Sequence, residues 1–196
     1  HSVVLCSSRP VHELDGATVL RSASSRTSVL LLELLCRHRW RVRPRFATVR
    51  AESSDLDALR GFPHDAVLVI GDAALLLSAE SRYPYVTDLG SAWKDWTGLP
   101  FVFAVWAARR EADHGAVQGV HSALLESRRW GLAHLAELAE LAARNTGLPL
   151  TLCQEYLGGL DYALSYRHLA GLTDFFRRLA QDGLVPDGSL SFITAA

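Results

Sequence analysis

The chain has 196 residues, a length that suits one large domain or two small lobes. Hydrophobic residues make up 49% of it and charged residues 21%, a globular composition with enough apolar material for a core. Its 20 basic and 21 acidic side chains nearly balance, which argues against a nucleic acid or another polyanion as partner.

The three cysteines, Cys6, Cys36 and Cys153, are few, odd in number and far apart. They form neither a disulfide framework nor a metal-ligand spacing, which favours a reducing cytoplasm. No basic region followed by an apolar core opens the chain, and no apolar run reaches the ~18–20 residues of a membrane span. Because the chain begins at His1 and contains no methionine, we expect it to be part of a longer polypeptide.

Strands are expected to alternate with helices over the first half of the chain. In chain order the pattern predicts a strand at 2–8, a strand at 17–20, a helix at 27–38, extended chain at 41–49, a short helix at 55–62 capped by Ser54 or Asp55, and a buried strand at 66–70. A tight corner at Gly71 and Asp72 then leads into another short helix. This alternation predicts an α/β fold with a mainly parallel sheet and covering helices.

The second half is expected to be mostly helical. The pattern predicts a helix that ends at Gly98, a strand at 101–109, long helices at 116–145 and 150–183, and a short extended "LSFIT" near the end. Candidate lobe boundaries fall near residues 8–15 and 98–101. The segment between them would be an insertion carried by another lobe.

The stretch "SASSRTSVLLLELL" places polar residues at the start of an apolar helix. Backbone N–H groups are free at a helix start, and the helix dipole adds partial positive charge there. Ser24, Ser25, Thr27 and Ser28 can add hydroxyl donors, and Arg26 a full charge. This combination predicts a carboxylate site more than a nucleotide site, since the glycines and lysine of a Walker loop are missing. The alternative is that Ser25 or Thr27 only caps the helix.

Two further stretches carry polar or aromatic side chains that could face a ligand. In "VIGDAALLL", Asp72 follows the carboxyl end of a strand, where ligands of open α/β sheets bind, or it caps the next helix. In "YVTDLGSAWKDWTGLPFVFAVW", Asp88 could orient a polar group. The aromatic residues of this block could wall a pocket for a flat ring or could simply fill the core; they are Trp93, Trp96, Phe101, Phe103 and Trp106.

Other patterns indicate no metal, nucleophile or nucleic-acid site. His114 and His121 would lie ~10 Å apart along a helix, too far to share one ion. Ser91 lies in "DLGSAW", which is not the Gly-x-Ser-x-Gly of a nucleophile elbow. The alternating arginines from Arg37 to Arg45 would share one face of an extended segment. They fit a solvated strand edge as well as a nucleic-acid edge, and the balanced charge favours the former.

Three stretches, "SSRTSVLLLELL", "VLVIGDAAL" and "YPYVTDLGSAWKDWTGLPFVFAVW", follow one another at spacings that resemble the MqnA family. The tail "YLGGLDYALSYRHLAGLTDFFRRLAQDGLV" is similar to the C-terminal helices of that family, so the resemblance covers nearly the whole chain. Its members are chorismate dehydratases of the futalosine route to menaquinone. The sister family MqnD shares the fold and the Thr-Ser helix start, but the "PFVFAVW" block favours MqnA.

The resemblance implies a cytoplasmic protein with the type II periplasmic-binding-protein fold, in which the ligand lies in a cleft between two lobes. It implies that residues 1–9 and 100–196 belong to the first lobe, whose N-terminal part lies outside this sequence. Residues 10–99 would form the inserted second lobe. The implied reaction converts chorismate to 3-[(1-carboxyvinyl)oxy]benzoate plus water, a hydro-lyase reaction for which we expect neither a metal nor an organic cofactor.

We combine this activity with the motifs to assign roles. Ser25, Thr27 and Ser28 are expected to bind one carboxylate, with Arg26 adding charge, and Ser2 to contact the other end of the ligand. The candidates for hydroxyl contacts or catalysis are Asp72 and Asp88, and those for the ring pocket are Trp93, Phe103 and Trp106. The alternatives are a receptor for a small carboxylate without chemistry, or an MqnD-like enzyme acting on cyclic dehypoxanthinyl futalosine.

Overall fold

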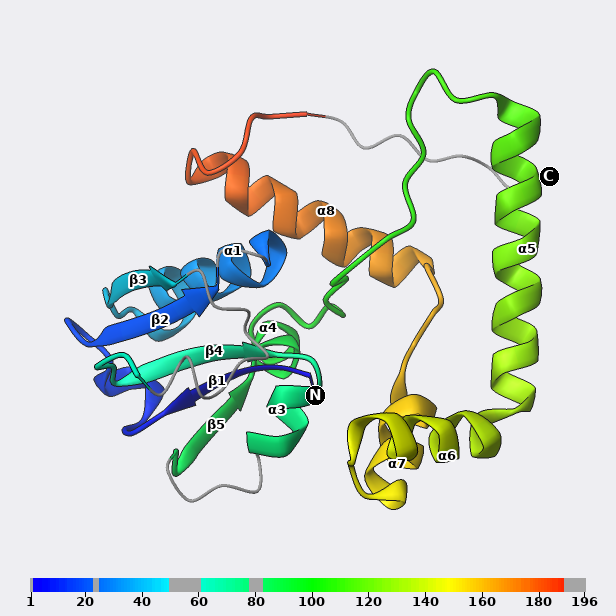
Figure 1. The fold of residues 1–196 in the computed structure, drawn as a ribbon. Helices are drawn as coiled ribbons and strands as arrows, with labels where there is room; N and C mark the ends of the chain where they lie inside the picture. Colours follow the sequence, from blue (N-terminus) through cyan, green and yellow to red (C-terminus); the bar gives the residue numbers. More distant parts are fainter. Residues whose placement is uncertain (1, 23–24, 50–60, 78–82, 189–196) are drawn as a thin grey trace. The chain divides into compact units, whose positions relative to one another are not determined.

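The computed structural model describes residues 2–22, 25–49, 61–77 and 83–188. The chain divides into two compact units (Figure 1). The first, here called the sheet unit, comprises His1–Phe103 and Ser165–Asp187, and the second, the helical unit, comprises Ala104–Leu164 and Gly188–Ala196.

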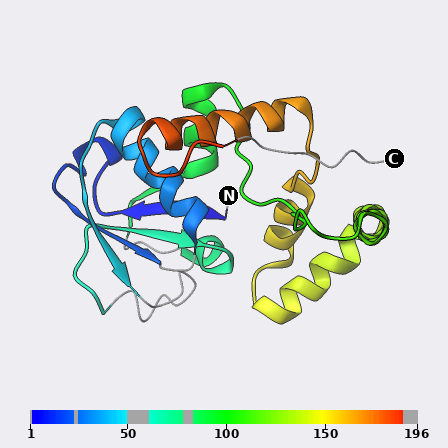
Figure 2. The same cartoon turned by 90° about the horizontal axis from the view of Figure 1, so that it is seen from above.

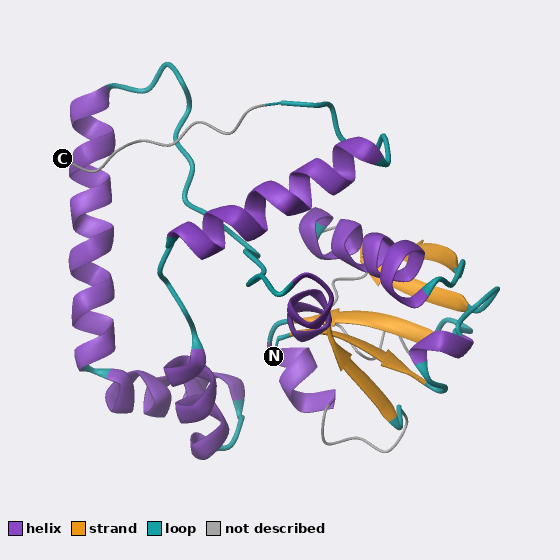
Figure 3. Cartoon of the chain, turned by 180° about the vertical axis from the view of Figure 1, so that it is seen from behind, coloured by secondary structure: helices purple, strands orange, loops and turns teal. Residues whose placement is uncertain are grey.

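Within the described residues, the sheet unit contains one five-stranded sheet in the order β3-β2-β4-β1-β5 (Figure 3). The strands are β1 (Val3–Ser7), β2 (Thr18–Ser22), β3 (Arg45–Val49), β4 (Ala66–Ile70) and β5 (Tyr85–Asp88). Strand β2 is parallel to β3 and β4, whereas β1 is antiparallel to β4 and β5. Four strands therefore share one direction, as the alternation predicted. The sheet is nevertheless mixed, because β1 runs between two of them in the opposite direction.

The central strands form because both faces of the sheet are covered. All five residues of β1 are buried, and so are four of the five in β4, which explains the uninterrupted apolar run "AVLVI". Successive side chains alternate between two core clusters: Val3 and Leu5 belong to one, and Val4 and Cys6 to the other. The edge strand β5 leaves Tyr85 and Val86 partly exposed.

Several helices of the described residues flank the sheet (Figure 2). They are α1 (Arg26–Leu34), α3 (Asp72–Leu77), α4 (Leu89–Thr97) and α8 (Tyr166–Gln181); a short 3₁₀ turn, η1 (Val11–Glu13), lies between β1 and β2. One core cluster contains buried residues of α1, α4 and α8, and the other contains Ala73 and Ala74 of α3. Helix α4 ends at Gly98, whose φ of 73° is the left-handed conformation that glycine adopts without strain. The expected stop at Gly98 is confirmed.

The arginine-rich segment is not the extended strand that its alternation indicated. Helix α1 continues into a wider π-helical turn, η2 (Leu35–Trp40), so Arg37 and Arg39 are helical. Arg41 then takes a left-handed conformation with φ of 56°. The arginines therefore do not share one extended face. Arg37 instead pairs with Asp182, at 2.8 Å, just after α8.

The helical unit contains α5 (His114–Ala133), α6 (Leu135–Thr146) and α7 (Leu150–Gly159). The helix expected at 116–145 is present but breaks at His134, and the one expected at 150–183 is interrupted over 160–165. The strand expected at 101–109 is wrong, because no described strand pairs with this segment. An apolar run becomes a strand only where a neighbour takes up its backbone hydrogen bonds.

Two expectations, the "LSFIT" segment and most of the helix at 55–62, fall outside the described residues. The sequence-based boundary assigned residues 1–9 and residues 10–99 to different lobes. In the structure, β1 pairs with β4 and β5, two strands of the segment 10–99. The division into two lobes itself stays a prediction. In the part of the chain that is described, no helix has both the length and the apolarity to cross a membrane.

Candidate ligand-binding site

Most of the polar residues singled out from the sequence lie at one edge of the sheet. Because β2, β4 and β5 share one direction, their carboxyl ends meet at this edge, and the antiparallel β1 begins there. Val3 pairs with Ile70, and Val4 with Asp88. The N–H of Gly71 donates to the carbonyl oxygen of Ser2 at 2.8 Å. Ser2, the start of α1, Asp72 and Asp88 thus lie at the same edge, here called the carboxyl edge.

At the start of α1, Ser25 does not act as a capping residue. It occupies the N-cap position, but its side chain accepts no hydrogen bond from the helix backbone. Its Oγ donates instead to Oγ of Ser28, at 2.9 Å. Ser28 is buried, with 4% exposure, while Ser25 and Thr27 are half-buried. Ser25 therefore leaves the N–H groups of the first turn available to an anion.

The charge at this helix start is positive and uncompensated within the described residues. The first turn of α1 contains no acidic residue, and Arg26 is exposed and makes no ion pair there. A guanidinium beside free N–H groups and the dipole of a nine-residue helix favours a carboxylate. The structure is therefore compatible with the anion-binding role predicted for Ser25, Arg26, Thr27 and Ser28.

The two aspartates at the carboxyl edge differ. Asp72 is exposed and is the first residue of α3, after the left-handed Gly71 with φ of 75°. Asp88 is half-buried and caps α4, because its Oδ1 accepts from the N–H of Ser91 at 2.7 Å. Oδ1 of Asp88 therefore has a structural role as the cap of α4, and this role does not depend on a ligand.

The three aromatic candidates lie in different surroundings. Trp93 has no exposed surface, so it could shape a pocket only through the residues packed on it. Its ring lies edge-on to Trp96 and Phe101 at centroid distances of 5.7 and 5.5 Å, and its Nε1 has no conventional acceptor. Phe103 is 38% exposed and belongs to the sheet unit, whereas Trp106 is 84% exposed and belongs to the helical unit. The structure does not place Trp106 at the carboxyl edge, and its role stays a prediction.

Sequence reasoning missed Gly90, which lies in the first turn of α4 beside Asp88. An ideal Cβ at this position would come within 3.2 Å of the Phe103 ring and 3.4 Å of Asp88 Oδ1. The signal was present in "DLGSAW", where a glycine interrupts the start of a helix at a cost of about 0.5–1 kcal/mol relative to alanine.

Two cysteines of the sheet unit are poor nucleophiles. Burial raises the pKa of the Cys6 thiol to about 11. Burial, together with the negative charge of Glu33, raises the pKa of Cys36 to about 12. Both stay protonated near neutral pH, and a neutral thiol neither attacks a substrate nor binds a metal readily. Among the described residues no group of three or more His, Cys, Asp or Glu side chains could hold a metal ion.

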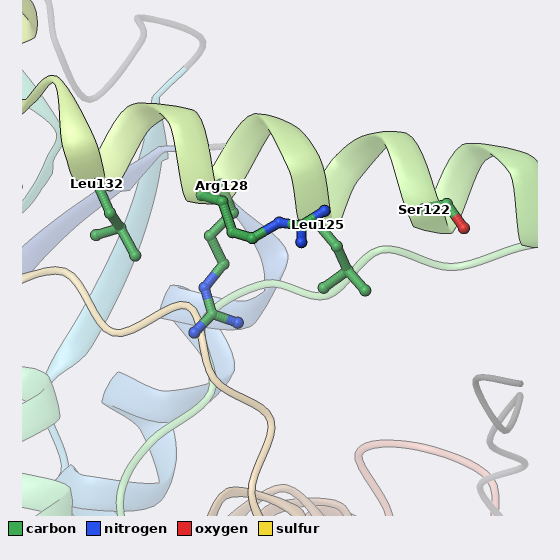
Figure 4. Close-up of a pocket in the computed structure, with 5 residues that line it drawn as sticks. Ser122, Leu125, Arg128 and Leu132 are labelled. Carbon is green, nitrogen blue, oxygen red and sulfur yellow. The ribbon is translucent and has the colours of Figure 1, made fainter.

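A hollow in the helical unit runs along α5 (Figure 4). The residues that line it are Ser122, Leu125, Arg128, Arg129 and Leu132. All of them come from one helix on which no residue is buried. None of the residues predicted to bind the ligand lines this hollow.

Comparison with known proteins identifies the family. A family model described as "Menaquinone biosynthesis" matches residues 1–181. The chain belongs to this menaquinone biosynthesis family. The resemblance to MqnA, drawn from the helix start and the tryptophan-rich block, is thereby confirmed.

Two curated relatives from Thermus thermophilus agree with this assignment. A protein named chorismate dehydratase is 36% identical over 178 residues, which is 83% of this chain and 63% of the relative. A 1,4-dihydroxy-6-naphtoate synthase is 35% identical over 69 residues, covering 32% of this chain and 25% of the relative. This member of the menaquinone family therefore spans less than two thirds of the length of either relative.

Solved structures establish the fold class. A crystal structure of a protein from Archaeoglobus fulgidus superposes with a TM-score of 0.72 at 19% identity, covering 94% of this chain and 69% of that one. The periplasmic aliphatic sulphonate binding protein SsuA from Escherichia coli gives a TM-score of 0.58 at 19% identity, covering 100% and 70%. The α/β fold is therefore periplasmic-binding-protein-like, as expected.

Proposed function

We propose that this protein is a chorismate dehydratase, which converts chorismate to 3-[(1-carboxyvinyl)oxy]benzoate and water. The observation that carries the proposal is the 36% identity to the Thermus chorismate dehydratase over 83% of the chain. The uncapped, positively charged start of α1 supports it, because chorismate carries two carboxylates. The reaction is a carbon–oxygen elimination, which makes the protein a hydro-lyase.

In this reaction a ring proton and the ring hydroxyl leave together as water, and the ring becomes aromatic. Aromatisation makes the step strongly downhill, so the protein has to bind, orient and desolvate the substrate and assist proton transfer. Ser25, Thr27 and Ser28 with their backbone N–H groups hold one carboxylate, and Arg26 adds long-range attraction. Ser2, whose carbonyl oxygen accepts from the N–H of Gly71, contacts the opposite end of the ligand. Asp72, the next residue after Gly71, is a candidate for contact with the ring hydroxyl.

The wider setting of the proposal follows the family. The proposal places the ligand at the carboxyl edge of the sheet unit. Catalysis calls for neither a metal nor an organic cofactor, and the partner is the small-molecule substrate, with no nucleic acid and no membrane. A cytoplasmic location is supported by Cys6, Cys36 and Cys153, which are all free and buried.

Replacing Thr27 and Ser28 together by alanine tests the anion site. Loss of two hydrogen bonds to a charged acceptor should weaken binding of 3-[(1-carboxyvinyl)oxy]benzoate by about 2–4 kcal/mol, measured by calorimetric titration. Ser122→Ala, which removes an exposed hydroxyl of α5, serves as the control and should bind normally. Unchanged affinity in the double variant would show that the start of α1 does not bind the carboxylate.

One assay separates the alternatives. The similarity to the 1,4-dihydroxy-6-naphtoate synthase covers 32% of the chain and favours a second candidate, an enzyme acting on cyclic dehypoxanthinyl futalosine. A receptor without chemistry would bind a carboxylate and turn nothing over. Incubation with chorismate, monitored for the aromatic product, gives turnover only for the dehydratase.

A further inference from the structure

Phe103 lies against the backbone of Gly90 in the first turn of α4. An ideal Cβ at position 90 would come within 3.2 Å of Cε2 and 3.4 Å of Cζ of the Phe103 ring. Contacts of 3.0–3.4 Å are tighter than ordinary van der Waals distances, so a methyl group at position 90 would displace one neighbour by a few tenths of an ångström. The missing side chain of Gly90 therefore makes the room that the ring occupies.

The Phe103 ring has no room to move toward the core. Phe103 packs edge-on against Phe101 at a centroid distance of 4.7 Å, and Phe101 lies between it and the buried pair Trp93 and Phe175, at 5.5 and 4.9 Å. Trp93 and Phe175 are 0% and 3% exposed, so this layer is close-packed. A substituent at position 90 would push the ring outward, to the side where Phe103 is 38% exposed.

The Phe103 ring lies beside the carboxyl edge. The Cβ direction of Gly90 points at both the Phe103 ring and Oδ1 of Asp88, the last residue of β5. Asp88 pairs with Val4, two residues after Ser2. Phe103 thus offers an apolar face beside the polar residues predicted to hold the ligand.

We propose that Gly90 is a positioning residue, which sets the place of the Phe103 ring against the six-membered ring of the substrate. The proposal rests on the proposed function. Gly90 itself touches no reacting atom and acts only through Phe103. Since a dispersion contact loses a quarter to a half of its strength over a 0.5–1 Å gap, a small shift of the ring weakens its contact with the ligand.

The chain offers a matched control in Gly115 of α5. Both glycines are the second residue of a helix that an aspartate caps: Asp88 Oδ1 accepts from Ser91 N–H at 2.7 Å, and Asp113 Oδ1 from Ala116 N–H at 2.8 Å. A Cβ at position 115 would likewise lie 3.4 Å from the capping oxygen, but no ring corresponding to that of Phe103 is among the neighbours within 4 Å of it. Gly115→Ala therefore reproduces every effect of Gly90→Ala except the one on Phe103.

The test compares Gly90→Ala and Gly115→Ala in the protein at its natural length, with chorismate as substrate. We expect Gly90→Ala to raise KM about three- to tenfold while the melting temperature stays within a few degrees of that of Gly115→Ala. Gly115→Ala should keep the wild-type KM. In a Phe103→Leu background, Gly90→Ala should change KM no further. Equal KM values for the two alanine variants, or an undiminished effect without Phe103, would overturn the proposal.

The NMR resonances of the Gly90 Hα protons test the placement of the Phe103 ring without an activity assay, and therefore independently of the proposed function. The ring current of a phenyl ring this close to Gly90 displaces one of the Hα resonances of Gly90 from its ordinary position, and Phe103→Leu should abolish that displacement. If the wild type consumes no chorismate, the proposed function fails. The role of Gly90 then depends on this resonance: an Hα at an ordinary position in the wild type would refute the placement of the ring.

Discussion

At the scale of the residue, Gly171 of α8 has the tightest surroundings of any described glycine. A Cβ built there would lie 2.1 Å from the carbonyl oxygen of Pro100, a distance that no side chain can occupy. The guanidinium of Arg167, one turn earlier, donates to the carbonyl oxygen of Gly98 at 3.0 Å. Helix α8 therefore approaches the end of α4 backbone to backbone, and only glycine permits it.

Gly171→Ala should destabilise the protein although alanine is the better helix former. The gain in helix propensity is about 1 kcal/mol, whereas forcing a methyl group into a packed site typically costs about 1–3 kcal/mol and occasionally more, and the 2.1 Å contact at Gly171 is a severe case. We expect a net loss of stability in urea denaturation. Gly119→Ala, in a helix position with open space around it, should gain stability instead. If both variants gain, α8 does not approach Pro100 this closely.

At the scale of the element, α4 links the core to the carboxyl edge. Its capping residue Asp88 lies at that edge, and Trp93, in its middle, lies in the core. Arg178 of α8 stacks over Trp96 at 4.2 Å and donates to Asp174 at 2.7 Å. Burial alone would raise the pKa of Asp174, but the hydrogen bonds from Arg178 and Arg177 outweigh it and lower that pKa. Helix α8 is therefore held on α4 by charged as well as apolar contacts.

Asp88→Ala and Asp88→Asn separate the two roles of this carboxylate. Asparagine also caps helices, so Asp88→Asn should retain most of the stability, while Asp88→Ala should lose about 0.5–2 kcal/mol. Thermal unfolding measures this difference. If Asp88 also contacts the substrate through its charge, Asp88→Asn will lower kcat/KM without lowering stability. A fully active, stable Asp88→Asn variant would leave Asp88 with the capping role alone.

At the scale of the whole molecule, burial is unevenly distributed between the two units. The described part of the sheet unit contains two core clusters that together include all of β1 except Ser7. In the helical unit, α5 buries no residue, and α6 and α7 bury one each, Ala139 and Cys153. Few buried apolar contacts mean a low free energy of local opening.

Hydrogen exchange should therefore differ strongly between the units. We expect the amides of β1 and β4 to exchange slowest, since both strands are buried and paired on both sides. Among the long helices, the amides of α5 should exchange fastest. No residue of α5 is buried, so solvent reaches its backbone hydrogen bonds more easily. Mass spectrometry of peptides from deuterium-labelled protein resolves the two regions. Equal protection of α5 and β4 would show that α5 is covered in solution.

The sequence by itself determined the local features of this protein. The run "AVLVI" predicted β4 with its bounds, Gly98 predicted the end of α4, and the polar start of α1 predicted a helix with a charged first turn. These succeed because side-chain periodicity, backbone freedom and dipole effects act within a few residues. The motifs of the helix start and the tryptophan-rich block also identified the family.

Only the tertiary structure decided which residues meet. The apolar run 101–109 has the composition of a strand but no partner strand within the described residues, so it stays irregular. Trp93 and Trp106 look alike in sequence, yet one is 0% and the other 84% exposed. The contact of Phe103 with Gly90 joins residues that are 13 positions apart. Such outcomes depend on pairing and packing between distant segments, and no local pattern contains that information.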